Sequence, residues 1–388
     1  MKKFSIIGYL ASVVGLFFYS FTQIDLGLTL SRASIWQTAE KFLKDIGYFQ
    51  RPFSSILFIG IILSLFFFYL MILRSVNEKK ISKRTIWFLI IATTIILTFS
   101  YNAFSYDLFN YMFDAKIVTY YNQNPYLHKA LDFPGDPMLS FMHWTHRLFP
   151  YGPTWLGLTV PLSFVGMQFF LPTFFLFKIM IATTFLGTVF FIGKILQRIS
   201  VKNELLGVVF FALNPLVIIE SLVSGHNDIT MMFFAMWALY LLMINKYVRT
   251  AILLILSVGV KFATLLLVPV FILIFFLQRY KQNINWEKII ILIIGLMLGA
   301  VIVATLRTTF QPWYLLYVLP FAALISNKYY VAIPAVIISV FAVFQYLPFL
   351  YLGNWDNPAP SVLFWMMTGS VILSLFFTIA WKNIKVIR

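Results

Sequence analysis

Long apolar runs recur along the chain, and short clusters of lysine and arginine separate them. Several runs, among them residues 54–73 and 288–306, reach the length of about 20 residues that a helix needs to cross a bilayer. Hydrophobic residues make up 61% of the 388 and charged residues 11%, whereas a soluble domain is about half apolar and a quarter charged. The pattern therefore predicts an all-α polytopic membrane protein, with residues 1–388 forming a single transmembrane domain.

The basic clusters predict which loops face the cytoplasm, because cytoplasmic loops carry an excess of Lys and Arg. The main clusters lie at residues 74–84, 194–202 and 279–288. Placing them and both termini inside gives about twelve crossings. The predicted spans are residues up to about 21, 54–73, 85–100, 170–193, 205–221, 229–245, 250–278 as a broken pair, 288–306, 312–326, 329–346 and 361–381. The net charge of +16 is thus a topology signal rather than a nucleic-acid-binding patch, and the absence of Cys excludes disulfides and thiolate metal sites.

Three stretches depart from a simple succession of spans. Residues 154–168 are apolar but short and contain Pro161, so we interpret them as a re-entrant or interfacial helix. Residues 250–278 would put Arg279 outside if they formed one span. Two short arms that meet near Lys261 keep Arg279 inside and bring Lys261 to the outer side. Residues 22–53 form a mixed-charge outer loop with room for an interfacial helix, and the sequence assigns them no role.

The stretch from Tyr106 to Pro153 concentrates ionisable side chains, with four aspartates and three of the four histidines. Ionisable residues beside a membrane core are costly to place and are functional candidates by default. Asp107, Tyr111 and Asp114 share one face of a predicted helix, with the two carboxylates about 10 Å apart. This separation is too long for one ion to bind both, so Asp107 is the candidate working carboxylate. A solvated amphipathic helix on the bilayer surface is the alternative.

Three further polar groups fall on the same predicted outer face as Asp107: the turn His226-Asn227-Asp228, Lys261 and Arg307. Lys261 and Arg307 can hold a phosphate or pyrophosphate, Arg through a bidentate fork and Lys as a point charge. The alternative is that both side chains only reach back to the membrane interface. A carboxylate beside an acceptor hydroxyl can act as a general base, which is the role that suits Asp107.

The remaining candidates also allow two interpretations each. His226, Asn227 and Asp228 can supply a metal ligand or hydrogen bonds to an acceptor, or they can cap the helix that follows. The sequence requires no cofactor, and a divalent cation at Asp107 or Asp228 stays open. Residues Gln311, Trp313 and Tyr314 can face a sugar ring or belong to the aromatic belt of the interface. No P-loop or GxGxxG segment is present, which disfavours nucleotide chemistry.

Six segments follow one another in a recognisable order: SYDLFNYMFDAK, NQNPYL, FPYGPTW, NPLVIIESLVSGHND, SVGVKFATLLLVP and QPWYLLYVLPF. Their order and predicted placement resemble the GT-C polyprenol-phosphate-sugar-dependent glycosyltransferases, especially the bacterial α-mannosyltransferases of lipoglycan synthesis and their uncharacterised relatives. The resemblance covers about residues 95–325. It implies a GT-C-like helix bundle in the plasma membrane, with extracytoplasmic interfacial helices and an extracytoplasmic catalytic loop at residues 101–153.

The resemblance also implies a reaction. A hexose, mannose before others, would pass from an undecaprenyl- or decaprenyl-phosphate sugar to a cell-envelope glycan or lipid-linked acceptor, with inversion at the anomeric carbon. Asp107 matches the catalytic base of this class, Asp114 or Asp228 would be a second acid, and Lys261 would hold the donor phosphate. The residues expected to bind substrate are Tyr111, Asp114, Asn124, Tyr126, Tyr151, His226, Asn227, Asp228, Lys261, Arg307, Gln311, Trp313 and Tyr314.

Two other functions stay open. A polymerase or ligase that uses polyprenyl-pyrophosphate glycans would need the same cationic outer cavity. A transporter or flippase of lipid-linked sugars would have polar groups at mid-membrane depth and internal repeats, and neither is evident in the sequence. Linkage and oligomeric state leave no signal in the sequence.

Overall fold

The computed structural model describes the backbone of residues 2–387 and the side chains of residues 3–383. All regular elements in this range are helices, so the prediction of an all-α protein is confirmed. The α-helices are α1 (Lys2–Ser20), α2 (Ser34–Lys44), α3 (Arg51–Asn77), α4 (Lys83–Thr98), α5 (Asp107–Thr119), α6 (Pro153–Val165), α7 (Phe170–Ile199), α8 (Glu204–Ala212), α9 (Pro215–Ile218), α10 (Asp228–Met243), α11 (Tyr247–Val260), α12 (Val268–Arg279), α13 (Trp286–Arg307), α14 (Leu319–Leu324), α15 (Tyr329–Phe344), α16 (Leu347–Leu352) and α17 (Ala359–Ile387).

Local sequence explains several helix starts. Ser82, Asn214 and Asn285 each accept a hydrogen bond from a backbone N–H in the first turn of the helix that follows. Such side-chain caps satisfy N–H groups that have no partner inside the helix. Pro153 and Pro215 open α6 and α9, where the missing N–H of proline costs nothing.

Within the described residues, seven helical segments are long and apolar enough to cross a membrane. They are residues 3–23, 51–77, 170–199, 262–279, 286–307, 329–352 and 359–383. An eighth is counted if the segments 201–212 and 215–223, which meet at a bend of 54°, form one span. The multi-pass character is therefore clear, but the predicted count of about twelve crossings is not confirmed. Predicted spans such as α4 and α10 are helices of 16 residues, shorter than a full crossing.

One predicted span is wrong, and one predicted break is confirmed. Residues 312–326 do not form a span but two six-residue pieces, the 3-10 helix η8 (Pro312–Tyr317) and α14. Pro320 lies just inside α14, where proline cannot continue the hydrogen bonding of a preceding helix. At the other site, α11 ends at Val260, Lys261 is extended, and a 3-10 helix, η7 (Phe262–Leu267), leads into α12.

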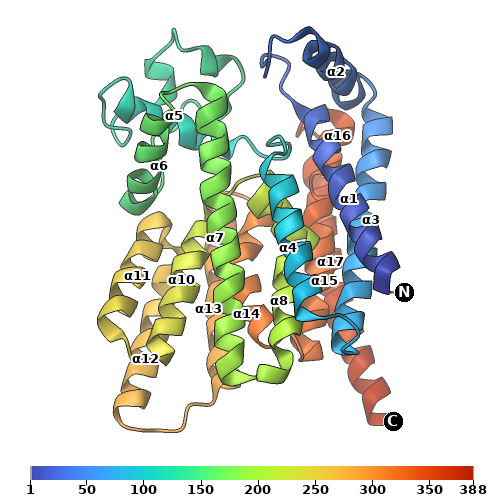
Figure 1. Cartoon of the computed structure of the whole chain (residues 1–388), viewed down its shortest axis with the longest axis vertical. Coiled ribbons are helices and arrows are strands. Elements are labelled where there is room, and N and C mark those ends of the chain that lie inside the picture. Colours follow the sequence, from blue (N-terminus) through green and yellow to red (C-terminus); the bar gives the residue numbers. More distant parts are fainter. Residues whose placement is uncertain (1, 388) are drawn as a thin grey trace.

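The helices form a bundle whose two ends differ (Figure 1). The α3–α4, α7–α8 and α12–α13 connections, which carry the three basic clusters, lie at one end. Helices α2, α5 and α6 lie at the opposite end. This separation agrees with the charge pattern used to predict the topology. Helix α6 has 13 residues, as expected for a segment too short to span, and the interfacial placement of α2 and α6 stays a prediction.

The core of the bundle surrounds α7, which packs against α4, α5, α6, α8, α10 and α14. Residues 207–232 are buried without exception, as are residues 314–326. The first of these segments includes the turn at 224–227, so the polar residues predicted for an outer turn lie inside the protein. They are covered by the loop and helix that follow α4, and this burial creates the candidate site.

Candidate active site

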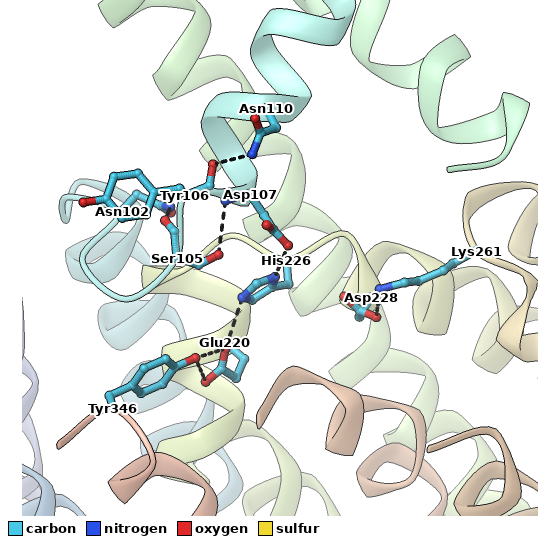
Figure 2. Close-up of polar contacts among 10 residues, drawn as sticks. All are labelled: Asn102, Ser105, Tyr106, Asp107, Asn110, Glu220, His226, Asp228, Lys261 and Tyr346. Carbon is cyan, nitrogen blue, oxygen red and sulfur yellow. Dashed lines mark hydrogen bonds and ion pairs between the residues drawn. The ribbon is translucent and has the colours of Figure 1, made fainter. Parts of the chain in front are cut away.

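Asp107 is the first residue of α5, and the preceding loop fixes its position (Figure 2). Its backbone N–H donates to the Ser105 hydroxyl at 3.1 Å, and the Asn102 side-chain amide donates to the Ser105 carbonyl. The first N–H groups of a helix lack partners within it, and the helix dipole favours negative charge at this end. The loop therefore places the Asp107 carboxylate where the helix stabilises its anion.

A continuous polar chain runs inward from Asp107 (Figure 2). The Nδ1 atom of His226 lies 3.5 Å from Asp107 Oδ2, and its Nε2 atom lies 3.3 Å from Glu220 Oε2. The Tyr346 hydroxyl donates to Glu220 Oε1 at 2.9 Å. Side-chain exposure is zero at His226 and Glu220 but 18% at Asp107, so Asp107 is the end of the chain that reaches the surface.

His226 is a buried cation. Burial alone lowers its pKa, but the neighbouring carboxylates of Asp107 and Glu220 outweigh burial and raise the pKa to about 9. The indole of Trp313 stacks on the imidazole with ring centroids 4.0 Å apart. The ring is thus held on its face by Trp313 and at both nitrogens by carboxylates. This arrangement fixes the orientation of Asp107.

The turn that carries His226 has an unusual backbone. A π-helix, η6 (Ile219–Val223), precedes it, and Gly225 adopts φ +68°, a conformation that glycine reaches without steric cost. The buried Lys178 ammonium donates to the carbonyls of Leu222 and Val223 at the end of η6. Lys178 thereby satisfies carbonyls that the helix end leaves free.

Asp228 and Lys261 form an ion pair across the site (Figure 2). Lys261 Nζ lies 2.7 Å from Asp228 Oδ1 and within 5.8 Å of the ring centroids of Tyr151, Tyr314 and Tyr317. Such rings attract a cation through their electron-rich faces. Asp228 opens α10, but the preceding Asn227 makes no side-chain capping bond, so the capping interpretation is wrong for Asn227. Its amide is fully buried, and neither its Nδ2 nor its Oδ1 has a hydrogen-bond partner.

Two glycines bring the α5–α6 loop against the break after α11. The Gly152 N–H donates to the Val260 carbonyl at 3.2 Å. A Cβ atom on Gly152 would lie 2.3 Å from the Gly259 carbonyl oxygen, and a Cβ on Gly259 would lie 2.2 Å from Thr154 Oγ1. Only glycine permits this approach. The contact places Tyr151 beside Lys261.

A small pocket adjoins Asp107. It is lined by Asp107, Asn110, Asp114, Ala130, Met142, Trp144, Arg147, Leu148, Pro150 and Tyr151. The predicted shared face of Asp107 and Asp114 is confirmed by their place in this lining. Burial, followed by the nearby Asp107 charge, raises the pKa of Asp114 well above its usual value, which favours the neutral acid. Tyr111 packs edge-on against Tyr151 at 5.1 Å.

The structure brings nine predicted residues together: Asp107, Tyr111, Asp114, Tyr151, His226, Asp228, Lys261, Trp313 and Tyr314. Of the other predicted residues, Tyr126 contacts this group and Asn227 lies between His226 and Asp228, whereas the side chains of Asn124, Arg307 and Gln311 are not among its contacts. Asn124 is exposed and accepts a bond from the Tyr126 N–H, while the Tyr126 hydroxyl donates to the Tyr151 carbonyl at 3.1 Å. Arg307 is exposed at the end of α13, and Gln311 bonds to Thr309 at 2.9 Å.

Sequence reasoning missed Glu220, Asn110, Arg147 and Tyr346. Glu220 had a usable signal, because it is an acidic residue within the apolar run at 205–223, where a charge marks a functional candidate. Asn110 lies one helical turn after Asp107 and shares its face. Tyr346 is 126 positions from Glu220, and no pattern in the sequence connects the two.

A divalent cation at Asp107 or Asp228 stays a prediction. No group of three or more His, Asp or Glu side chains in the described part of the chain is arranged to hold a metal ion. Asp228 is paired with Lys261, and Asp107 lies beside the His226 cation. Each of the two carboxylates thus already has a cation beside it.

Comparison with curated proteins finds no match, and neither does comparison with solved structures. The model of one family does match, over residues 9–277. This family is described as alpha-(1→6)-mannopyranosyltransferase, N-terminal domain, of the MptA_B family. The matched residues extend from α1 almost to the end of α12 and include Asp107, His226 and Lys261. The chain therefore belongs to this family of mannosyltransferases.

Proposed function

We propose that this protein transfers mannose from a polyprenyl-phosphate sugar to a hydroxyl group of a cell-envelope glycan or lipid-linked acceptor. The family supports mannosyl transfer in general. The polyprenyl-phosphate donor, the acceptor and the inverting course are our proposals, as is an active site on the extracytoplasmic side of the plasma membrane. The apolar helices would let a polyprenyl chain approach from the bilayer.

The observation that carries the proposal is the pairing of a surface-reaching carboxylate with a nearby cation. Asp107 is partly exposed and held by the buried His226 cation, while Lys261 lies beside Tyr151, which lines the same pocket as Asp107. A carboxylate and a separate cation near one tyrosine suit a displacement in which a hydroxyl attacks and a phosphate leaves.

The proposed reaction is one in-line displacement. The acceptor oxygen forms a bond to the anomeric carbon of mannose as the bond from that carbon to the phosphate oxygen breaks. Asp107 takes the hydroxyl proton, and the electron pair of the broken bond stays on the polyprenyl phosphate. Because attack and departure occur on opposite faces, the anomeric configuration inverts.

Lys261 would stabilise the departing phosphate. Its side chain is 23% exposed, whereas the Asp228 carboxylate that it contacts is fully buried. The ammonium group can therefore contact a substrate phosphate without leaving its buried partner. The Tyr151, Tyr314 and Tyr317 rings around it would hold the ammonium in place.

The test is mannosyl transfer in proteoliposomes from a panel of radiolabelled polyprenyl-phosphate sugars. Asp107→Asn should lower the rate by about 10²- to 10⁴-fold, the usual contribution of a general base. Asp132→Asn is a matched control, because Asp132 belongs to the same loop and its side chain is 37% exposed. The control should transfer mannose at the wild-type rate.

Other outcomes would redirect the assignment. Full activity of Asp107→Asn would remove Asp107 from the mechanism. Transfer only from diphosphate donors would favour the polymerase or ligase. Movement of lipid-linked sugar across the membrane without formation of a glycosidic bond would favour the transporter.

A further inference from the structure

The pocket beside Asp107 has a rim that the proposed mechanism does not use. Asp107, Asn110 and Asp114 follow one another at intervals of three and four residues and form a stripe of oxygen-bearing side chains along α5. The loop segment at 143–150 lies against this stripe and contributes Trp144 and Arg147 to the pocket lining. Both Trp144 and Arg147 are exposed.

Trp144 is held in a strained backbone conformation. Its φ is 59°, in the left-handed region that a bulky side chain rarely adopts. The loop maintains this conformation, because the Trp144 carbonyl accepts from the Arg147 N–H at 3.0 Å and the Thr145 carbonyl accepts from the Leu131 N–H at 3.2 Å. Strain that the surrounding structure maintains is characteristic of functional positions.

The loop leaves the indole of Trp144 exposed. Trp144 is 48% exposed, and the Arg147 guanidinium lies over its ring at 4.2 Å from the centroid. A cation in this position fixes the ring and adds hydrogen-bond donors at its edge. A flat aromatic surface bordered by polar groups suits a pyranose, which has an apolar C–H face and hydroxyls around its rim.

The dimensions and charge of the pocket decide how a sugar could lie there. The cavity is about 50 Å³, which holds a few water molecules but not a hexose. A hexose would therefore lie across the mouth, against Trp144, with hydroxyls directed at the α5 stripe. The lining has carboxyl groups at Asp107 and Asp114 against one guanidinium at Arg147, so it is not a cationic site for a phosphate, and Lys261 is not part of it.

We infer that Trp144, Arg147 and Asn110 form the subsite for the acceptor sugar, a neutral hexose unit whose attacking hydroxyl is presented to Asp107. The designation of this sugar as the acceptor rests on the proposed function. The subsite itself rests on the strained indole, the guanidinium over it and the oxygen-bearing stripe beneath it.

The experiment uses the full chain in proteoliposomes and α-1,6-linked mannotriose as the acceptor probe. Trp144→Ala should raise the acceptor KM about tenfold and leave the donor KM unchanged, because a favourable aromatic stack contributes roughly this factor. Trp355→Ala is the matched control, since Trp355 is 50% exposed and stacks on Phe349 away from the pocket. The control should leave both KM values unchanged.

A second variant separates binding from folding. Trp144→Gly removes the ring but also relieves the strained backbone, because glycine adopts positive φ readily. Its melting temperature should equal or exceed that of the wild type, while its acceptor KM rises as in Trp144→Ala. An acceptor KM unchanged in both variants, or a rise in the donor KM instead, would overturn the subsite.

Calorimetric binding of mannotriose distinguishes this inference from the proposed function. If no donor supports transfer but mannotriose binds wild type and not Trp144→Gly, the subsite stands and the transfer reaction is wrong. If transfer proceeds and mannotriose binding does not depend on Trp144, the reaction stands and the subsite is wrong.

Discussion

The buried His226 cation predicts a specific dependence of stability on pH. Its pKa is raised from 6.5 to about 9 by the carboxylates of Asp107 and Glu220. Each pKa unit corresponds to about 1.4 kcal/mol, so the protonated ring contributes on the order of 3 kcal/mol to the free energy of unfolding. Because His226 is fully buried and Asp107 is only 18% exposed, solvent screens these pairs much less than it screens surface pairs.

The sign follows from linkage. The folded-state pKa lies above the unfolded-state value, so the folded protein holds the proton more tightly. The stabilisation is fully present below about pH 6.5 and is lost as the pH rises through about 9. Above that pH, the His226 ring between Asp107 and Glu220 is neutral and no longer offsets their negative charge.

The assay is the thermal denaturation midpoint of the detergent-solubilised protein between pH 6 and pH 10. Wild type should lose several degrees across this range relative to His226→Gln, which has no titrating group at this position. Lysines and tyrosines also titrate near the upper end, so the relevant quantity is the difference between the two curves. His128→Gln is the control, because His128 is a partly exposed histidine 3.6 Å from Asp132.

Parallel curves for wild type and His226→Gln would refute the reasoning. They would mean that His226 is neutral over the whole pH range, or that the carboxylates of Asp107 and Glu220 do not raise its pKa. A change of slope in His128→Gln equal to that in His226→Gln would also refute it, because partly exposed ion pairs contribute little.

Two further predictions concern the groups that hold the site together. Gly259→Ala should lower the denaturation midpoint by the equivalent of about 1–3 kcal/mol and impair transfer, because the new methyl group overlaps Thr154. Gly295→Ala is the control, since a methyl group there has nothing within 4 Å, and it should have no such effect. Tyr346→Phe should lower the free energy of unfolding by about 1–3 kcal/mol, because it removes a hydrogen-bond donor from the buried Glu220. In the control Tyr330→Phe, the lost hydroxyl bonds Glu287 at the surface, so the change should stay within about 0.5 kcal/mol. Equal midpoints within either pair, measured by the same thermal assay, would contradict the prediction.

Much of the site could be predicted because the chain is so apolar. Against that background, charged groups such as Asp107, Asp228 and Lys261 stand out, and membrane burial makes each one a candidate. The break before Lys261 was also predictable, because one continuous span would have placed basic residues on the wrong side. The two short helices at 312–326, which were predicted as one span, were not predictable, because an apolar run buried in protein resembles one buried in lipid.

The sequence by itself determined the helical, membrane-spanning class and the small set of charges from which a site could be built. Tertiary structure alone decided their partners. His226 lies between Asp107 and Glu220 because the turn at 224–227 is buried beneath the start of α5, and Tyr346 reaches Glu220 from a distant helix. The physical reason is that hydrophobic periodicity and charge report the environment of a segment, whereas the pairing of buried polar groups depends on how helices far apart in the sequence pack.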